Sequence, residues 1–320
     1  MRVVAASTLT LLLAGTAAAQ TPAADAPAAA AKPGATLDTS GFQYERRLPE
    51  GPSELVTLPL DAAALAHSQG PISNFADVRI VDDRNAQIPY VLEQRSELLT
   101  VELAINATTP QVPDLAKRGR GTLSFYLITL PYENLPYPAV RLETSEHVFR
   151  RIIELGVQRE PDRRHKAGWF DSLERVNWQH SEPDSPAPPL DVPFHRLDSR
   201  ELLLIVDEGD NRPLPISRAA LRLPGWQLRF FRPASPLRLL YGRTDLREPR
   251  YDVALLSPSV LSGPAREIVA APEVAVRRPA ALLTPRSFWM VLSVAVVVLL
   301  GLIARLISSG TGPRPSPPAP

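Results

Sequence analysis

The chain has 320 residues, of which 44% are hydrophobic and 22% charged, and its formal net charge is +1. These values exclude an intrinsically disordered chain and an overall basic field for nucleic acid. The 35 prolines argue against a mainly helical protein, and the absence of cysteine excludes disulfides, thiol nucleophiles and cysteine metal sites.

Residues 1–19 have the pattern of a secretory signal peptide. Met1-Arg2 precede an apolar run, Val3 to Ala14, and Ala17-Ala18-Ala19 supplies an Ala-x-Ala cleavage site. The alternative is an uncleaved anchor or a buried helix, but about twelve apolar residues are short for a membrane span. Residues 20–40 are rich in alanine and proline, which predicts a flexible linker.

From Phe42 onward, short apolar stretches alternate with Pro, Gly, Asn and Asp. Many short strands separated by turn signals indicate a mainly β protein with tandem antiparallel β-sandwich domains of jelly-roll type. An Asp N-cap also predicts a short helix over Asp61–His67. The predicted divisions are an N-terminal β domain (41–135), a middle β-sandwich (136–223), a C-terminal β segment (224–260) and a stalk (261–286).

Near the C-terminus, the run from Phe288 to Ala304 is uncharged. We predict a transmembrane helix over residues 287–307 that embeds Phe288 to Ile307 in the membrane. The alternative is a buried core helix, which is disfavoured because the run is apolar on every face and is closed by Arg305, only 15 residues before residue 320. Basic residues do not favour the C-terminal side as cytoplasmic, but long domains translocate largely regardless of charge. We therefore expect residues 20–286 outside the cytoplasm and a Pro-rich cytoplasmic tail at 308–320.

The densest acidic cluster comprises Asp207, Glu208, Asp210 and Asn211 around Gly209. Three carboxylates and an amide oxygen are ligands that calcium prefers. Asp, Gly and Asn are also turn formers, and the cluster lacks the twelve-residue calcium-loop spacing. The turn interpretation is therefore favoured, and these residues are candidate metal ligands only as the alternative.

Four side chains near a polar loop are candidate ligand-binding residues: Trp169, Phe170, Trp178 and His180. Aromatic faces beside hydrogen-bonding groups are suited to sugar rings. The favoured alternative is that both tryptophans close the sandwich core.

Several short segments resemble the DUF3999 family, bacterial membrane-anchored envelope proteins of unknown function. They are Asn74–Asp83, Gln87–Tyr90, Glu201–Ile205, Gly209–Leu214, Leu240–Gly242 and Pro249–Asp252. The middle region, Leu142 to Leu223, is similar to galactose-binding-like β-sandwiches, which implies a jelly roll and permits glycan binding. The resemblance also implies a polytopic inner-membrane partner, and it supplies no catalytic residue.

These observations predict a non-catalytic, single-pass protein of the bacterial inner membrane, with a periplasmic ectodomain that binds a glycan or partner protein and has no cofactor. Without Arg2, Arg305 and Arg314, the ectodomain has two more acidic than basic residues, which argues against nucleic acid. The alternative is an envelope polysaccharide or peptidoglycan hydrolase using Asp207, Glu208 and Asp210. A purely structural spacer is a third hypothesis.

Overall fold

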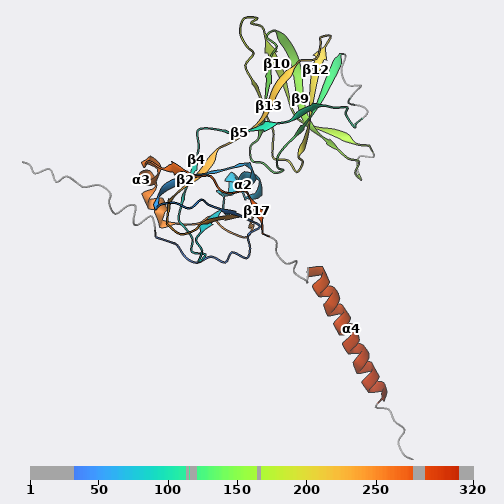
Figure 1. The fold of residues 1–320 in the computed structure, drawn as a ribbon. Helices are drawn as coiled ribbons and strands as arrows, with labels where there is room; N and C mark the ends of the chain where they lie inside the picture. The colour runs from blue at the N-terminus through green and yellow to red at the C-terminus, as the bar shows by residue number, and fades with distance from the viewer. Residues whose placement is uncertain (1–31, 113–114, 116–120, 164–166, 277–284, 310–320) are drawn as a thin grey trace, which may run out of the picture. The chain divides into compact units, whose positions relative to one another are not determined.

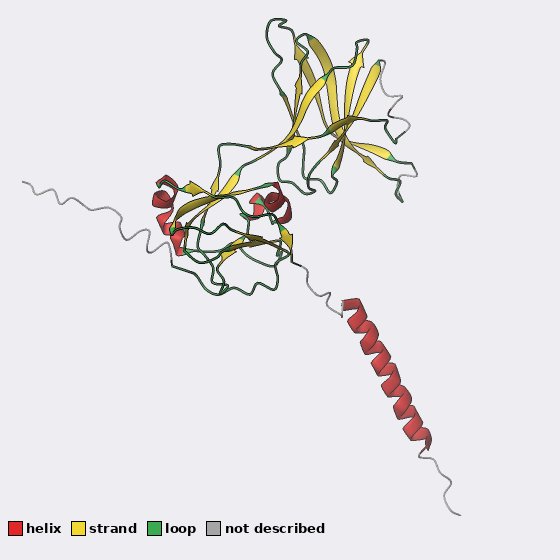
Figure 2. Cartoon of the chain, in the orientation of Figure 1, coloured by secondary structure: helices red, strands yellow, loops and turns green. Residues whose placement is uncertain are grey.

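The computed structural model describes residues 32–112, 115, 121–163, 167–276 and 285–309. The predicted signal peptide, most of the linker and most of the C-terminal tail lie outside these residues. The described chain is mainly β and divides into two compact units after Ala275 (Figures 1 and 2). The mainly β prediction is therefore confirmed.

The first sandwich consists of two four-stranded sheets, with orders β17-β1-β15-β3 and β16-β2-β14-β4. The strand pairs are antiparallel, except that β16 runs parallel to β2. Its strands are β1 (Tyr44–Arg47), β2 (Glu54–Leu60), β3 (Arg79–Val81), β4 (Val91–Gln94), β14 (Trp226–Arg232), β15 (Arg238–Tyr241), β16 (Arg266–Glu267) and β17 (Val274–Ala275).

The second sandwich consists of a five-stranded sheet, β10-β9-β12-β7-β6, and a four-stranded sheet, β11-β8-β13-β5. All of these strand pairs are antiparallel. Its strands are β5 (Leu99–Leu103), β6 (Ile105–Ala107), β7 (Thr122–Thr129), β8 (Ala139–Thr144), β9 (Phe149–Arg159), β10 (Trp169–His180), β11 (Leu190–Pro193), β12 (Glu201–Gly209) and β13 (Ile216–Leu223).

These pairings correct the predicted domain boundaries. Strands β5 to β7 belong to the second sandwich, so the boundary at 135 falls inside it. The predicted C-terminal segment 224–260 supplies β14 and β15 to the first sandwich, which is therefore discontinuous in sequence. Residues 266–275, predicted as stalk, contribute β16 and β17 to the same sandwich. The proline-rich composition of residues 261–286 indicates a spacer, but the backbone of residues 266–275 pairs with the distant strands β1 and β2 and is therefore part of the sandwich.

The short helices are α2 (Ala62–His67), η1 (Pro71–Ser73), η3 (Asp252–Leu256) and α3 (Ser257–Ser262). The predicted cap of α2 is confirmed, because the Asp61 side chain accepts from the Ala64 N–H (3.0 Å). The apolar stretch 251–256 resembles a strand in composition but does not form one: Tyr251 is extended, and the chain then turns into η3 and into α3, which has Pro258 in its first turn. The predicted linker also ends earlier, because Thr36 forms a β-bridge with Ala86.

Strand β12 is the central strand of the five-stranded sheet and shows how the sandwich core forms. Leu202, Leu204 and Val206 are buried in the core between the two sheets. Leu203 and Ile205 belong to a separate cluster on the other side of the sheet. Because successive strand residues point to opposite faces, the unbroken apolar run of β12 indicates that both faces are covered at this point.

Helix α4 spans Pro285–Ser309 and includes the segment predicted to cross the membrane. Trp289 and Leu299 are among its exposed apolar side chains. No helix in the described part of the chain combines the length and apolarity of a membrane crossing. The transmembrane assignment stays a prediction.

A test of the packing on the five-stranded sheet is Gly156→Ala. A methyl group at Gly156 would overlap the Phe170 ring and the Asp171 carbonyl oxygen. We expect the free energy of unfolding to fall by about 1–3 kcal/mol, because the ring and the neighbouring strand must shift. Gly34→Ala is the matched control, since its methyl group would meet Gln87 at an ordinary 3.5 Å. Equal thermal midpoints for the two variants would contradict this packing.

Candidate functional site

Trp178 lies in the core of the second sandwich. Its side chain is 4% exposed and packs edge-on against Phe149, with ring centroids 5.1 Å apart. The indole Nε1 donates a hydrogen bond to the Pro188 carbonyl (3.3 Å). Trp178 is therefore positioned as a core residue, the alternative that the sequence favoured, and does not present a face to a sugar ring.

The other three candidate ligand-binding residues also lie on strand β10, but they do not gather into one surface. Phe170 is buried over Gly156, on the opposite side of the sheet from Trp178. Trp169 is half-buried and lies opposite Arg159 at the start of β10. His180 is half-buried at the far end of that strand, with Nδ1 within hydrogen-bonding distance of the His147 carbonyl.

The structure does bring His180 together with Asn211. Both line a surface pocket of about 640 Å³, which also includes Arg150, Arg151 and Gln179. This proximity brings the end of β10 close to the turn after β12, although 31 positions separate His180 from Asn211 in the sequence. Sequence spacing contained no signal for it, because the hairpin of β9 and β10 and the end of β12 meet only in the folded sheet.

The acidic cluster is divided between the faces of β12. Asp207 lies on the outward face, where its Oδ1 accepts from the Gly209 N–H (3.0 Å). Glu208 is 1% exposed, and its Oε2 accepts from Arg151 Nε (2.6 Å) and from the Leu214 N–H (3.1 Å). Strand alternation therefore keeps the two carboxylates from facing one substrate.

The end of β12 forms a turn. Gly209 has φ +59°, and both the backbone N–H and the side-chain amide of Asn211 donate to the Glu208 carbonyl. Asp210 is exposed at this turn. Within the described residues, no group of three His, Cys, Asp or Glu side chains is placed to hold a metal ion. The carboxylates of Asp207, Glu208 and Asp210 have three different environments and do not point toward one common site.

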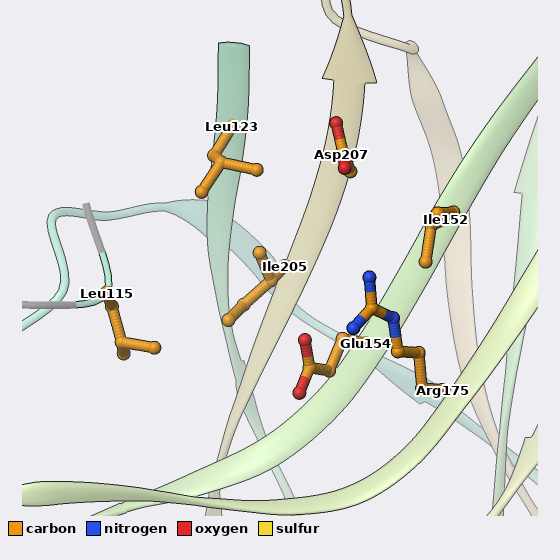
Figure 3. A pocket seen from close by; sticks show the side chains of 7 residues that line it. All are labelled: Leu115, Leu123, Ile152, Glu154, Arg175, Ile205 and Asp207. Carbon is orange, nitrogen blue, oxygen red and sulfur yellow. The ribbon is translucent and has the colours of Figure 1, made fainter. Parts of the chain in front are cut away.

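The outward face of the five-stranded sheet contains a pocket of about 330 Å³ (Figure 3). Strand register builds it from two adjacent rows: Asp207 lies opposite Ile152, and Ile205 lies opposite Glu154. Arg175 on β10 lies opposite Glu154. The lining residues are Leu115, Leu123, Ile152, Glu154, Arg175, Ile205 and Asp207. We refer to this set as the sheet-face pocket.

The sheet-face pocket combines charged side chains with apolar ones. Ile205 is buried, whereas Ile152 and Glu154 are half-buried and Arg175 is exposed. Glu154 and Arg175 lie directly opposite each other on β9 and β10, and their oppositely charged side chains face one another (Figure 3), although no ion pair within 4.0 Å joins either of them to another described residue. Such groups remain available to a partner with complementary charge and apolar surface.

Sequence reasoning identified Asp207 but missed Glu154 and Arg175. The signal was present in β9, where Arg151, Ile153, Leu155 and Val157 alternate toward the core. The intervening positions, including Ile152 and Glu154, must then share the outward face. Which strands flank β9, and therefore which residues join Glu154, is decided by long-range pairing.

No family model matches the chain, and no curated protein matches it. A crystal structure of an aminopeptidase from the marine sediment archaeon Thaumarchaeota archaeon is similar at 11% identity over 54% of this chain and 37% of that chain. The TM-score is 0.19, so this likeness carries no argument about fold or activity.

The buried pair beneath the turn is tested by Arg151→Met. We expect a loss of about 3–5 kcal/mol in the free energy of unfolding, because the Glu208 carboxylate stays buried without its charged partner. Replacing both residues, Arg151→Met with Glu208→Met, should restore most of the loss. Arg150→Met is the control on the exposed face and should change stability by less than about 0.5 kcal/mol. A double variant as unstable as the single one would contradict this explanation.

Proposed function

We propose that the protein is a non-catalytic binding or scaffolding protein of the bacterial cell envelope. It is anchored in the inner membrane as a single-pass protein, with the β-sandwiches in the periplasm, and it acts beside a polytopic membrane partner. The signal-peptide pattern and the uncharged run Phe288 to Ala304 support this location. The resemblance to DUF3999 proteins supports the partnership.

The observation that carries the binding role is the sheet-face pocket. An apolar floor beside two opposite charges is compatible with a specific protein contact, in which apolar burial gives affinity and charges give orientation. Ile152, Leu123 and Ile205 supply the floor, and Glu154 and Arg175 supply opposite charges. We assign this face to a periplasmic segment of the polytopic partner.

The alternatives have weaker support. A hydrolase using Asp207 and Glu208 together needs both carboxylates at one substrate, whereas strand alternation separates them. A sugar platform made by Trp178 and Phe170 needs exposed rings, and both rings are buried. The sandwich architecture is compatible with a galactose-binding-like module, which stays part of the proposal.

The experiment is chemical cross-linking of the full-length protein in its native membrane, followed by affinity purification and identification of polytopic proteins. Glu154→Arg and Arg175→Glu should each reduce recovery of the partner about tenfold, since a reversed charge at a desolvated contact costs more than a kcal/mol. Glu182→Arg and Arg163→Glu make the same charge changes in exposed loops outside the pocket and should leave recovery unchanged.

Thermal midpoints of the two loop variants should match the parent, because the substituted groups are exposed. Each pocket variant puts like charges directly across β9 and β10, which should lower stability by no more than about 1 kcal/mol. Equal recovery of the same polytopic protein from parent and pocket variants would refute the assigned face. Failure to recover any polytopic protein from the parent would refute the scaffolding role itself.

A further inference from the structure

Sequence segments that lie far apart converge in the first sandwich around two buried charges. Asp77 is 1% exposed and accepts hydrogen bonds from the backbone N–H groups of Gln69 (2.8 Å) and Gly242 (2.7 Å). Burial raises the pKa of the Asp77 carboxyl, against the backbone N–H groups that lower it. The carboxyl therefore connects the segment around Asn74 to the turn after β15.

Arg79 makes a second connection. It is 4% exposed, and its guanidinium donates to the carbonyls of Ala76 (2.8 Å), Val78 (2.7 Å) and Arg247 (2.7 Å). A buried guanidinium that satisfies backbone carbonyls holds loops in place and does not itself contact a ligand. Together, Asp77 and Arg79 fix the segments 74–79 and 242–251 as neighbours.

A pocket of about 370 Å³ opens where these segments meet β4 and β14. Its aromatic walls are Tyr90, Trp226 and Tyr251, and its polar groups are Asn74, Glu248 and Ser257. This size and this mixture of aromatic surface with a few polar groups are typical of small-molecule sites. The pocket is separate from the sheet-face pocket and shares no residue with it.

The aromatic rings are held in fixed positions. Tyr90 and Tyr251 pack edge to face, with centroids 5.4 Å apart. The Tyr90 hydroxyl donates to the Val78 carbonyl (2.8 Å), and the Tyr251 hydroxyl donates to Gln87 Oε1 (3.0 Å). Burial raises the pKa of Tyr251 to about 12, so its hydroxyl stays a neutral donor near neutral pH. Trp226 packs against Phe75 at 5.4 Å. The walls are therefore preorganised.

One of the polar groups, Asn74, lies on strained backbone. Asn74 and Phe75 have φ of +47° and +50°, in the left-handed region that is costly for a bulky side chain such as Phe75. Asn74 is exposed, and its Nδ2 donates to Glu248 Oε2 (3.3 Å). Strain of this kind persists where the surrounding structure imposes it, and it concentrates at functional sites. Here it places an amide beside a carboxylate at the mouth of an aromatic pocket.

We propose that this pocket binds an uncharged saccharide ring, a neutral hexose or N-acetylhexosamine unit. The apolar C–H face of a pyranose packs on flat aromatic walls, and its hydroxyls exchange hydrogen bonds with amide and carboxylate oxygens. Glu248 accepts from hydroxyl donors and repels a carboxylate, which disfavours uronic acids. The aromatic walls therefore suit the apolar face of the sugar ring, and the polar groups suit its hydroxyls.

The test is a glycan array probed with the full-length protein in a detergent that has no sugar headgroup. Neutral hexose and N-acetylhexosamine oligosaccharides should bind, and uronic acid oligosaccharides should bind more weakly. Glu248→Gln and Tyr251→Ala should each weaken binding about tenfold, through loss of a charged acceptor and of an aromatic wall. Tyr251→Phe keeps the ring and should bind within about twofold of the parent.

Controls separate binding from folding. Glu248 is exposed, so Glu248→Gln should keep the parent's thermal midpoint even if Tyr251→Ala does not. Tyr137→Ala removes an exposed tyrosine outside the pocket and should bind as the parent does. No saccharide bound by the parent, binding of uronic acids alone, or unchanged binding by Glu248→Gln would each overturn the proposal. None of these results depends on the partner assigned to the sheet-face pocket.

Discussion

The two-residue alternation of β12 is the constraint on which the second sandwich depends. This strand pairs with both β7 and β9, so a shift of one residue would exchange the faces of the whole central strand. The buried contact of Glu208 with Arg151 makes such a shift costly, because it would bring the carboxylate out of register with its guanidinium. The register of β12 therefore determines both which of its side chains enter the core and which lie on the outward face.

The same alternation explains why neighbouring acidic residues have unrelated roles. Glu208 is committed to the interior, whereas Asp207 joins Glu154 and Arg175 on the outward face. In the first sandwich, buried charge acts similarly: Asp77 and Arg79 satisfy backbone groups and thereby hold an aromatic pocket open. In both sandwiches, buried ionic groups fix the backbone beneath a pocket, and other residues line that pocket.

Features that depend on neighbouring residues can be predicted from the sequence. The Asp61 cap, the period-two run of β9 and the turn after Glu208 follow from neighbouring residues. Pairing between distant strands cannot be predicted from local signals. The proline-rich composition of residues 261–286 therefore indicates a stalk although it includes β16 and β17, and no local pattern connects Glu154 with Arg175. Asn74, Tyr90 and Tyr251 lie in separate sequence segments, and only the folded chain brings them to one pocket.

Cysteine accessibility tests the central claim that strand alternation separates a core face from the outward face that contains the sheet-face pocket. The chain has no native cysteine, so a single introduced thiol reports one position. In the folded full-length protein, a maleimide should modify Asp207→Cys and Glu154→Cys rapidly, and should modify Val206→Cys and Ile153→Cys only after denaturation, because the last two side chains are fully buried. Rapid modification of Val206→Cys with protection of Asp207→Cys would contradict the register and the sheet-face pocket built on it.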